Sequence, residues 1–164
     1  MKIAITGPES SGKTSLAIAL AKELGVSYVP EFARFYLQEK GLDYTQKDLH
    51  DMAKEQIKWW QRAGNDFVAD TDLTVFRIWE EVKFQHPSNE LGNLVYDFDL
   101  YILCKPDIPW ESDPLREDEH DREELFVRYE KELRNNHLSF TIVEGNPTQR
   151  LQAALRFIQT EKGH

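Results

Sequence analysis

The clearest chemical signature in the sequence is GPESSGKT at residues 7–14, a complete G-x-x-x-x-G-K-[ST] pattern between an apolar run and an amphipathic stretch. Its two glycines permit backbone angles and close approaches that a Cβ atom would obstruct. The loop amides can then point inward at an anion, assisted by the positive end of the following helix. Lys13 would bridge the β- and γ-phosphates, and the Thr14 hydroxyl would bind Mg²⁺. The pattern therefore predicts a nucleoside-triphosphate site that involves Gly7, Glu9, Ser10, Ser11, Gly12, Lys13 and Thr14.

A charged pair follows the second apolar run. Glu31 and Arg34 lie three residues apart at the expected start of a helix, so both side chains can face one cleft. Ligands of doubly wound sheets bind beyond the carboxyl ends of the strands. Glu31 could therefore accept a proton or a hydrogen bond from a substrate hydroxyl, and Arg34 could hold an anion. The alternative is a surface ion pair at a capped helix start.

Two aspartates follow the third apolar run, in the tripeptide DTD at residues 70–72. A carboxylate that ends a strand beside a phosphate-binding loop commonly orients Mg²⁺, and Asp70 is predicted to do so. Asp72 could hold ribose hydroxyls or the attacking hydroxyl of a substrate, or it could cap the helix that begins at Leu73. Trp79, on the same helix, could pack in the core or form a wall of a substrate site.

Residues 105–124 differ in composition from the rest of the chain, with three prolines and with eight acids at positions 111–124. Such a segment cannot form a sheet strand, so it is either a solvated loop or a lid that closes over a ligand. Arg116 and Arg122 are the cations best placed to reach a transferring phosphate. Trp110 indicates that the segment covers something flat, because a large aromatic side chain is unusual in a solvated acidic loop.

The composition excludes several classes of protein. Twenty basic against 29 acidic residues give a net charge of −9, which argues against binding to a nucleic-acid backbone. The single cysteine, Cys104, lies in an apolar run and excludes an intramolecular disulfide and every multi-cysteine zinc pattern. No stretch approaches the ~20 apolar residues of a membrane span, and no signal peptide is expected. We therefore expect a cytoplasmic protein with a single domain, residues 1–164; its oligomeric state is left open, a homo-oligomer included.

The histidines show no metal-ligand spacing and are expected at the surface: His50, His86, His120, His137 and His164.

Short β-branched or aromatic runs alternate with longer amphipathic stretches, which predicts βαβ units and a three-layer, doubly wound α/β domain. Strands are expected at Lys2–Thr6, Val26–Val29, Asp66–Ala69, Leu100–Cys104 and Phe140–Val143. Helices are expected at Lys13–Leu24, Glu31–Lys40, Thr45–Ala63, Leu73–Gln85, Glu123–Asn135 and Pro147–Thr160. Thr45 with Asp48 resembles a capping box, and Asn146 is a good N-cap before Pro147.

Several classes that share the phosphate-binding loop are excluded by other features. GTPases read guanine with an N-K-x-D segment, which the sequence lacks. AAA+ machines need a second helical domain, for which 164 residues are too few. A small P-loop kinase or an isolated ATPase remains.

Five segments in order, GPESSGKT, VPEFARFY, DTDLT, ILCKPDIPWESDPLR and VEGNPTQRL, resemble the ribosylnicotinamide kinase domain of NadR-type NAD-biosynthesis proteins, as a free-standing domain. The resemblance runs from Ile3 to about Leu151. It implies a five-stranded parallel sheet of order 2-3-1-4-5 with a lid. It also implies transfer of the γ-phosphoryl group of ATP to the 5′-hydroxyl of nicotinamide riboside, a small-molecule nucleoside. The alternatives are a kinase for another nucleoside or nucleotide, and an ATP-binding switch protein.

The resemblance also implies roles for individual residues. Gly12, Lys13, Thr14 and Ser15 would bind ATP and Mg²⁺. Asp70 and Glu31 would serve the metal and the substrate hydroxyl, with the identity of the base left open. Trp110 would stack on the nicotinamide ring, while Arg116 and Arg122 would belong to the lid. The residues that would border adenine are Asn146, Pro147 and Arg150.

Overall fold

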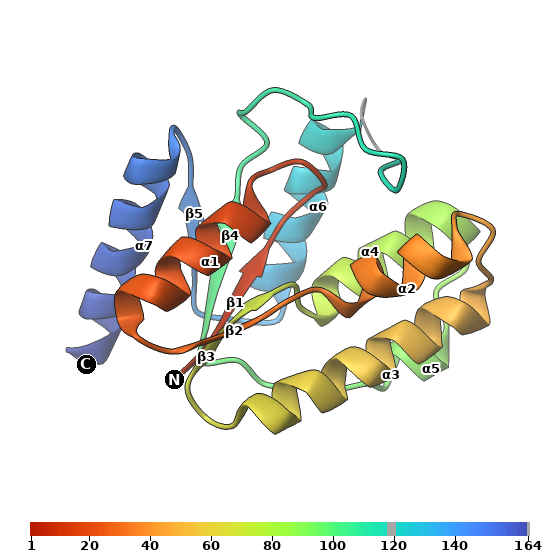
Figure 1. Cartoon of the computed structure of the whole chain (residues 1–164), viewed down its shortest axis with the longest axis horizontal. Helices are drawn as coiled ribbons and strands as arrows, with labels where there is room; N and C mark the ends of the chain where they lie inside the picture. Colours follow the sequence, from red (N-terminus) through yellow and green to blue (C-terminus); the bar gives the residue numbers. More distant parts are fainter. Residues whose placement is uncertain (118–120, 164) are drawn as a thin grey trace.

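A computed structural model describes residues 1–117 and 121–163 of the chain. Five strands form one parallel sheet of order β2-β3-β1-β4-β5 (Figure 1), as the resemblance implied. Because β1 is central, its residue Ile5 pairs with Asp70 on one side and with Ile102 on the other. The strands are β1 Lys2–Thr6, β2 Ser27–Val29, β3 Phe67–Asp70, β4 Leu100–Cys104 and β5 Phe140–Val143.

The helices follow the predicted order, with small shifts at their ends and one addition. The short helix α5 was not predicted, because four residues are too few to show a helical period. The bounds are α1 Lys13–Leu24, α2 Phe32–Lys40, α3 Gln46–Ala63, α4 Leu73–Phe84, α5 Asn89–Gly92, α6 Arg122–Asn135 and α7 Pro147–Lys162. Among the described residues, none of these helices is long and apolar enough to cross a membrane.

The expected helix starts are confirmed at two caps. The Thr45 side chain accepts a hydrogen bond from the amide of Asp48, whose carboxylate accepts one from the amide of Thr45. Asn146 and Gln149 make the same reciprocal pair at the start of α7, with Pro147 at the first helical position. These side chains satisfy backbone amides that a helix start leaves without partners.

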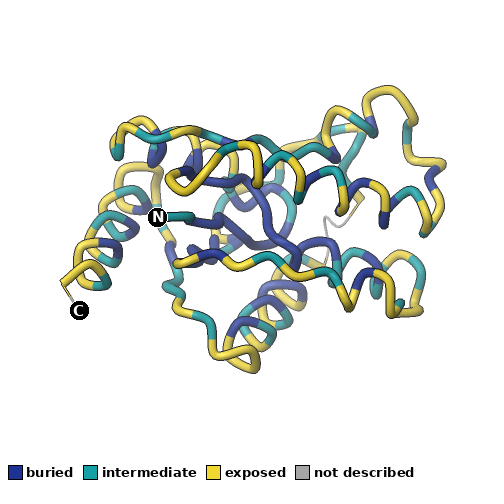
Figure 2. The backbone as a smooth tube through the Cα atoms, turned by 90° about the horizontal axis from the view of Figure 1, so that it is seen from below, coloured by how far each residue is buried: buried dark blue, intermediate teal, exposed yellow. Residues whose placement is uncertain are grey.

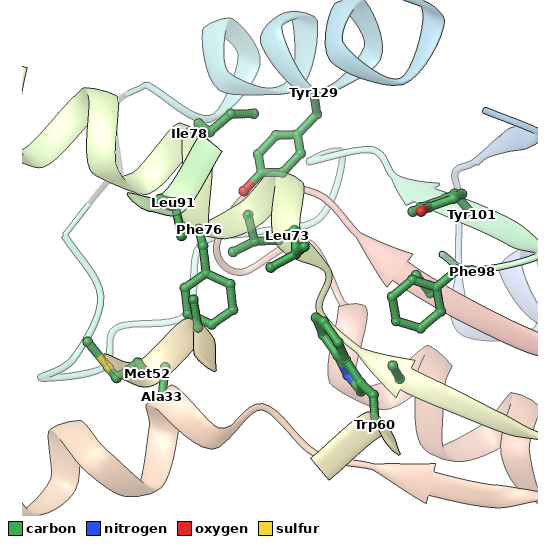
Figure 3. Close-up of a cluster of buried hydrophobic side chains, with 14 of the residues drawn as sticks. Ala33, Met52, Trp60, Leu73, Phe76, Ile78, Leu91, Phe98, Tyr101 and Tyr129 are labelled. Carbon is green, nitrogen blue, oxygen red and sulfur yellow. The ribbon is translucent and has the colours of Figure 1, made fainter. Parts of the chain in front are cut away.

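Alternating strand residues divide the core into two layers on opposite faces of the sheet. Ile3, Ile5 and Ile102 face α1 and α7, whereas the other strand face meets α2, α3, α4 and α6. Figure 2 shows the buried strands between helices whose outer edges are exposed. Figure 3 shows the second layer, to which different elements contribute Ala33, Met52, Trp60, Leu73, Phe76, Ile78, Leu91, Phe98, Tyr101 and Tyr129. Cys104 is also buried, in the first layer, as its apolar surroundings predicted.

One histidine corrects the expectation that all five lie at the surface. His50 of α3 is only 7% exposed, and its two ring nitrogens lie 2.6 Å from Glu80 and 3.0 Å from Glu90. The partners come from α4 and from the first turn of α5, 30 and 40 residues away in the chain. A local pattern does not reveal such a pairing. His120 and His164 lie outside the described residues.

Candidate active site

The phosphate-binding loop has the backbone geometry that its glycines predicted. Gly7 has a φ of 135°, and a Cβ atom there would lie 2.8 Å from the carbonyl oxygen of Cys104. Gly12, with a φ of 82°, is the N-cap of α1. Both positions therefore need glycine. The loop joins the end of β1 directly to the N-terminus of α1, which is the arrangement that binds phosphate groups in such folds.

The loop is held in place by hydrogen bonds within it and by hydrogen bonds from a side chain of α7. The hydroxyl of Ser11 and the ammonium of Lys13 both donate to the Pro8 carbonyl, at 2.6 and 2.8 Å. Arg150 of α7, 3% exposed, donates to the carbonyls of Ser11, Gly145 and Lys105 and pairs with Asp107. The Arg150 guanidinium thereby holds the loop against the end of β4 and the turn before α7, and its expected place beside adenine stays a prediction.

Asp70 and Thr14 meet at the end of β3. The hydroxyl of Thr14 donates to Oδ2 of Asp70 at 2.5 Å, and the hydroxyl of Tyr28 donates to the same oxygen at 3.2 Å. The other oxygen, Oδ1, is buried and has no hydrogen-bond partner within the described chain. A buried oxygen of this kind requires a partner such as water or an ion. The pair of a hydroxyl and a carboxylate with a spare oxygen fits Mg²⁺, which prefers oxygen ligands and one or two carboxylates.

Glu31 is the N-cap residue of α2 and lies in the wall of the same cavity as Lys13. Burial is the largest cause that raises the pKa of Glu31, and the negative charges of Asp70 and Glu9 raise it further. The positive charges of Lys13 and Arg34 only partly offset these effects, so the pKa rises to about 7. A carboxyl group with this pKa can accept a proton near neutral pH.

Asp72 takes the capping role that was the alternative to substrate binding. Its carboxylate accepts hydrogen bonds from the Thr6 hydroxyl at 2.7 Å and from the amides of Thr74 and Val75 at the start of α4. Asp72 is 2% exposed. These contacts orient it toward α4, whereas Asp70, two residues earlier, bonds to Thr14 at the end of the phosphate-binding loop.

The described part of the expected lid, residues 105–117 and 121–124, packs over the loop; residues 118–120 lie outside the described residues. The amide of Glu111 donates to the Ser10 hydroxyl, and the amide of Glu117 donates to a carboxylate oxygen of Glu9, both at 2.9 Å. Arg34 pairs with Asp113 and so joins α2 to the same segment. The segment therefore connects the phosphate-binding loop to α2, and Figure 1 shows it above the loop at the upper edge of the molecule.

The predicted lid arginines hold backbone groups of the lid and the loop. Arg122 donates to the carbonyls of Ser10 and Ile108 at 3.0 and 3.1 Å, and Arg116 donates to the carbonyl of Glu111 at 2.6 Å. Trp110 lies beside both guanidinium groups. Its ring centroid is 6.0 Å from the guanidinium carbon of Arg116 and 5.6 Å from that of Arg122. Its flat partners in this structure are therefore two arginines.

One cavity of about 410 Å³ collects most of the predicted residues. The predicted residues that are not among the described lining residues are Asp70, Asp72, Trp110, Arg122, Asn146, Pro147 and Arg150. The lining of the cavity combines the phosphate-binding loop and the charged side chains of Glu31, Arg34 and Arg116 with apolar side chains of α2, α4, α6 and the lid segment. The residues that line it are Gly7 to Ser15, Glu31, Ala33, Arg34, Leu37, Val75, Ile78, Trp79, Val82, Ile108, Glu111, Leu115, Arg116, Glu117, Leu125 and Tyr129.

Sequence reasoning missed two polar residues near this cavity, Tyr28 and Tyr44. The hydroxyl of Tyr28 bonds to Asp70, whereas that of Tyr44 bonds to Trp79 and Glu117. The position of Tyr28 in the second strand, opposite Val68 of β3, could have indicated a contact near the strand end. No local signal marks Tyr44, because its partners lie 35 and 73 residues away.

The sheet order, the loop after β1 and the carboxylate at the end of β3 define the fold of a P-loop kinase. The chain belongs to the family described as an AAA domain, whose model matches residues 2–150. The match covers the phosphate-binding core as one domain, so it does not contradict the exclusion of AAA+ machines, which rested on their second helical domain.

Solved structures support the fold. The NadR protein in complex with NR has a TM-score of 0.79 and 21% identity, with 99% of this chain and 50% of NadR covered. NadR in complex with NAD and AMP-PNP has a TM-score of 0.77 and 20% identity, over the same shares of the two chains. Deoxyadenosine kinase from M. mycoides, with a TM-score of 0.70 and 20% identity, is covered over its full length and over 98% of this chain. The resemblance to NadR is thus confirmed as a likeness of fold.

Among curated proteins, cytidylate kinase from Thermotoga neapolitana is 34% identical over 103 residues, which is 59% of this chain and 43% of that relative. The chain spans about half of the NadR protein, and the matched region spans less than half of the cytidylate kinase.

Proposed function

We propose that the protein is an ATP-dependent kinase that phosphorylates the 5′-hydroxyl of a nucleoside. The observation that carries this proposal is the cavity that Glu31 lines together with the phosphate-binding loop and a group of apolar side chains. A pure ATP-binding switch needs no such acceptor space. A kinase needs a base near the γ-phosphate and, next to that base, enough space for the acceptor.

In this mechanism the loop amides and Lys13 hold the β- and γ-phosphates of ATP. Glu31 accepts the proton of the acceptor hydroxyl while the acceptor oxygen bonds to the γ-phosphorus and the bond to the bridging oxygen of ADP breaks. Arg116, in the wall of the cavity, stabilises the negative charge on the transferring group. Arg122 supports this arrangement through its bonds to the loop and to the lid.

Thr14 and Asp70 are the residues that would hold Mg²⁺. The Thr14 hydroxyl bonds to one carboxylate oxygen of Asp70, and the other oxygen is buried and has no hydrogen-bond partner within the described chain. The ion would neutralise charge on the phosphate oxygens. Tyr28 keeps the Asp70 carboxylate in place through a hydrogen bond to the oxygen that Thr14 contacts.

Nicotinamide riboside is the acceptor that we propose, and the product is nicotinamide mononucleotide. The sequence resemblance to ribosylnicotinamide kinase domains supports this choice, as does the similar fold of NadR, which has been solved in complex with NR. Deoxyadenosine kinase and cytidylate kinase carry the names of other acceptors, which are the alternatives to test. A cytoplasmic location and the absence of nucleic-acid partners remain predictions from composition.

The direct test of the phosphate site is Lys13→Ala. Loss of the cation that follows the γ-phosphoryl group is expected to lower kcat by about 10³-fold or more, while the fold stays intact. Steady-state assays with ATP and nicotinamide riboside measure the loss, and circular dichroism checks the fold. Phosphoryl transfer at a near-normal rate by the folded variant would refute the assignment.

A further inference from the structure

Trp79 is the tryptophan that lines the cavity among the described residues, and it comes from the middle of α4. Trp59 and Trp60 lie on α3, where Trp60 is fully buried. Trp110 lies against two arginines of the lid segment and the start of α6. Among the described lining residues the aromatic side chains are therefore Trp79 and Tyr129 of α6, and Trp79 is the larger of the two.

The ring of Trp79 is held in one orientation. It stacks on Phe76, with the ring centroids 6.2 Å apart and the planes 17° from parallel. Tyr44 meets it edge-on, and the indole Nε1–H donates to the Tyr44 hydroxyl at 2.6 Å. A planar side chain fixed in this way loses little freedom when a flat ligand packs on it.

Tyr44 connects this ring to the lid. Its hydroxyl donates to a carboxylate oxygen of Glu117 at 2.9 Å, and Lys83 donates to the other oxygen at 2.7 Å. The amide of Glu117 in turn donates to Glu9 of the phosphate-binding loop. One chain of hydrogen bonds thus runs from the phosphate site through the lid to the indole of Trp79.

The position of Trp79 relative to the sheet favours the acceptor over the nucleotide donor. Trp79 packs against the core layer formed by α2, α3, α4 and α6. The residues expected near adenine, around Asn146, lie at the start of α7, which belongs to the other layer with α1. The phosphate-binding loop separates the two sides, so a ligand that touches Trp79 lies on the side of Glu31.

We infer that Trp79 is the wall on which the ring of the acceptor packs, and that Tyr44 and Glu117 are positioning residues that fix this wall when the lid is closed. This inference rests on the proposed function, since it names the acceptor contact of the same site. The aromatic contact with the acceptor is thereby assigned to Trp79 of α4 and not to Trp110 of the lid segment.

The test begins with the unmodified protein, the four nucleosides nicotinamide riboside, cytidine, deoxyadenosine and uridine, and the nucleotide cytidylate. The best acceptor is then used for the variants. Trp79→Leu is expected to raise its KM by about tenfold, equivalent to about 1.4 kcal/mol, because stacking is lost. Trp79→Phe should recover part of this loss. Tyr44→Phe, which removes only the hydroxyl, should raise the acceptor KM about threefold with little change in kcat.

Trp59→Leu is the matched control, because Trp59 packs on Phe32 and Phe35 outside the described cavity lining. It should leave both KM values unchanged, and all variants should keep the KM for ATP. The inference is overturned if Trp79→Leu affects the acceptor no more than Trp59→Leu, or if Trp110→Leu produces the acceptor-specific loss instead.

Failure of the proposed function gives a different result, in which none of the four nucleosides is phosphorylated. Calorimetric binding of the same nucleosides in the presence of AMP-PNP then decides the inference alone. Binding that weakens in Trp79→Leu and persists in Trp59→Leu supports it, and no binding by the unmodified protein overturns it.

Discussion

Glu31 has an environment that differs clearly from that of an ordinary surface carboxyl group. Its position as the N-cap of α2 places it beside Lys13, and burial with two nearby acids raises its pKa to about 7. The sequence predicted a residue at this place but left open whether Glu31, Asp70 or Asp72 is the base. Asp70 bonds to Thr14, whereas Glu31 lines the cavity, and this difference supports the proposal that Glu31 is the base.

Glu31→Gln is expected to lower kcat by about 10²- to 10⁴-fold, because the base is lost. In the unmodified protein, kcat/KM should rise with pH through about 7, where Glu31 loses its proton, and this rise should be absent from the variant. Initial rates at saturating ATP across this range measure both effects. Loss of nucleotide affinity in Glu31→Gln would contradict the role of Glu31 as the base.

The same pKa shift predicts an effect on stability. A carboxyl group whose folded pKa is raised from 4.5 to about 7 favours the folded state below pH 4.5, and this advantage is lost as the pH rises through 7. Glu31→Gln should therefore raise Tm above pH 7 and change it little below pH 4.5. Thermal melts at both ends of this range check the sign. A Tm that falls above pH 7 would show that ionised Glu31 stabilises the fold.

Asp70→Asn tests the metal site. The substitution keeps the size of the side chain and removes its charge, so higher Mg²⁺ concentrations should be required for half-maximal rate with every acceptor. Titration of Mg²⁺ at fixed ATP gives the measurement, and Glu31→Gln, which leaves Thr14 and Asp70 intact, is the matched control. An unchanged Mg²⁺ requirement in Asp70→Asn would rule out Asp70 as a ligand.

At the scale of elements, α3, α4 and α5 are joined by a buried polar cluster. Glu80 of α4 accepts hydrogen bonds from Gln46 at 2.9 Å and from Ser88 at 2.6 Å, and it lies 2.6 Å from His50. Burial alone would raise the pKa of Glu80, but the hydrogen bonds from Ser88, Gln46 and His50 together lower it to about 2. The cluster supports α4, the helix that carries Trp79.

Glu80→Gln is expected to destabilise the fold by about 1–3 kcal/mol at neutral pH, because it removes the charge from hydrogen bonds that are strong in a buried site. A lowered folded pKa contributes stability above the ordinary value of 4.5, and this contribution is lost as the pH falls through 2. Denaturant unfolding at neutral pH and near pH 3 should therefore show a smaller difference between the variant and the unmodified protein at the lower pH. An equal difference at both pH values would mean that the charge of Glu80 does not stabilise the fold.

The elements were largely predictable, and the contacts between them were not. The strands and the long helices follow from apolar runs and amphipathic periods, and the caps at Thr45 and Asn146 follow from local sequence. The burial of His50 and of Arg150 depends on acids that lie 30 to 43 residues away in the chain. These pairings arise from the packing of α3 on α4 and of α7 beside β4, which a local pattern does not contain.

At the scale of the whole molecule, the sheet separates two layers and the phosphate-binding loop opens at its carboxyl edge between them. The motif predicted the loop, and the strand-end rule predicted Glu31 and Asp70. The apolar part of the cavity lining could not be predicted, because α2, α4, α6 and the lid segment each contribute only a few of its residues. Trp110 is a second example. The composition of the segment showed that this residue is unusual there, but the contacts of its ring with Arg116 and Arg122 depend on the fold.

The charge of the molecule bears on the choice of acceptor. The net charge of −9 and the acids of the lid segment favour a cationic ligand over a neutral one, although salt screens this attraction beyond about 10 Å. Nicotinamide riboside carries a positive charge on its ring, and an indole face attracts such a ring by up to about 2 kcal/mol when water is excluded. Uridine has a similar size and no such charge.

The most direct test of the proposed kinase activity is the ratio of kcat/KM for nicotinamide riboside to that for uridine, measured with the unmodified protein, ATP and Mg²⁺, and with Lys13→Ala as the blank. We expect formation of nicotinamide mononucleotide and a ratio of about ten or more, because the positively charged ring is attracted both to the indole face and to the nearby acidic residues. A ratio below one would contradict the proposed acceptor. Equal rates in the unmodified protein and in Lys13→Ala would contradict the kinase itself.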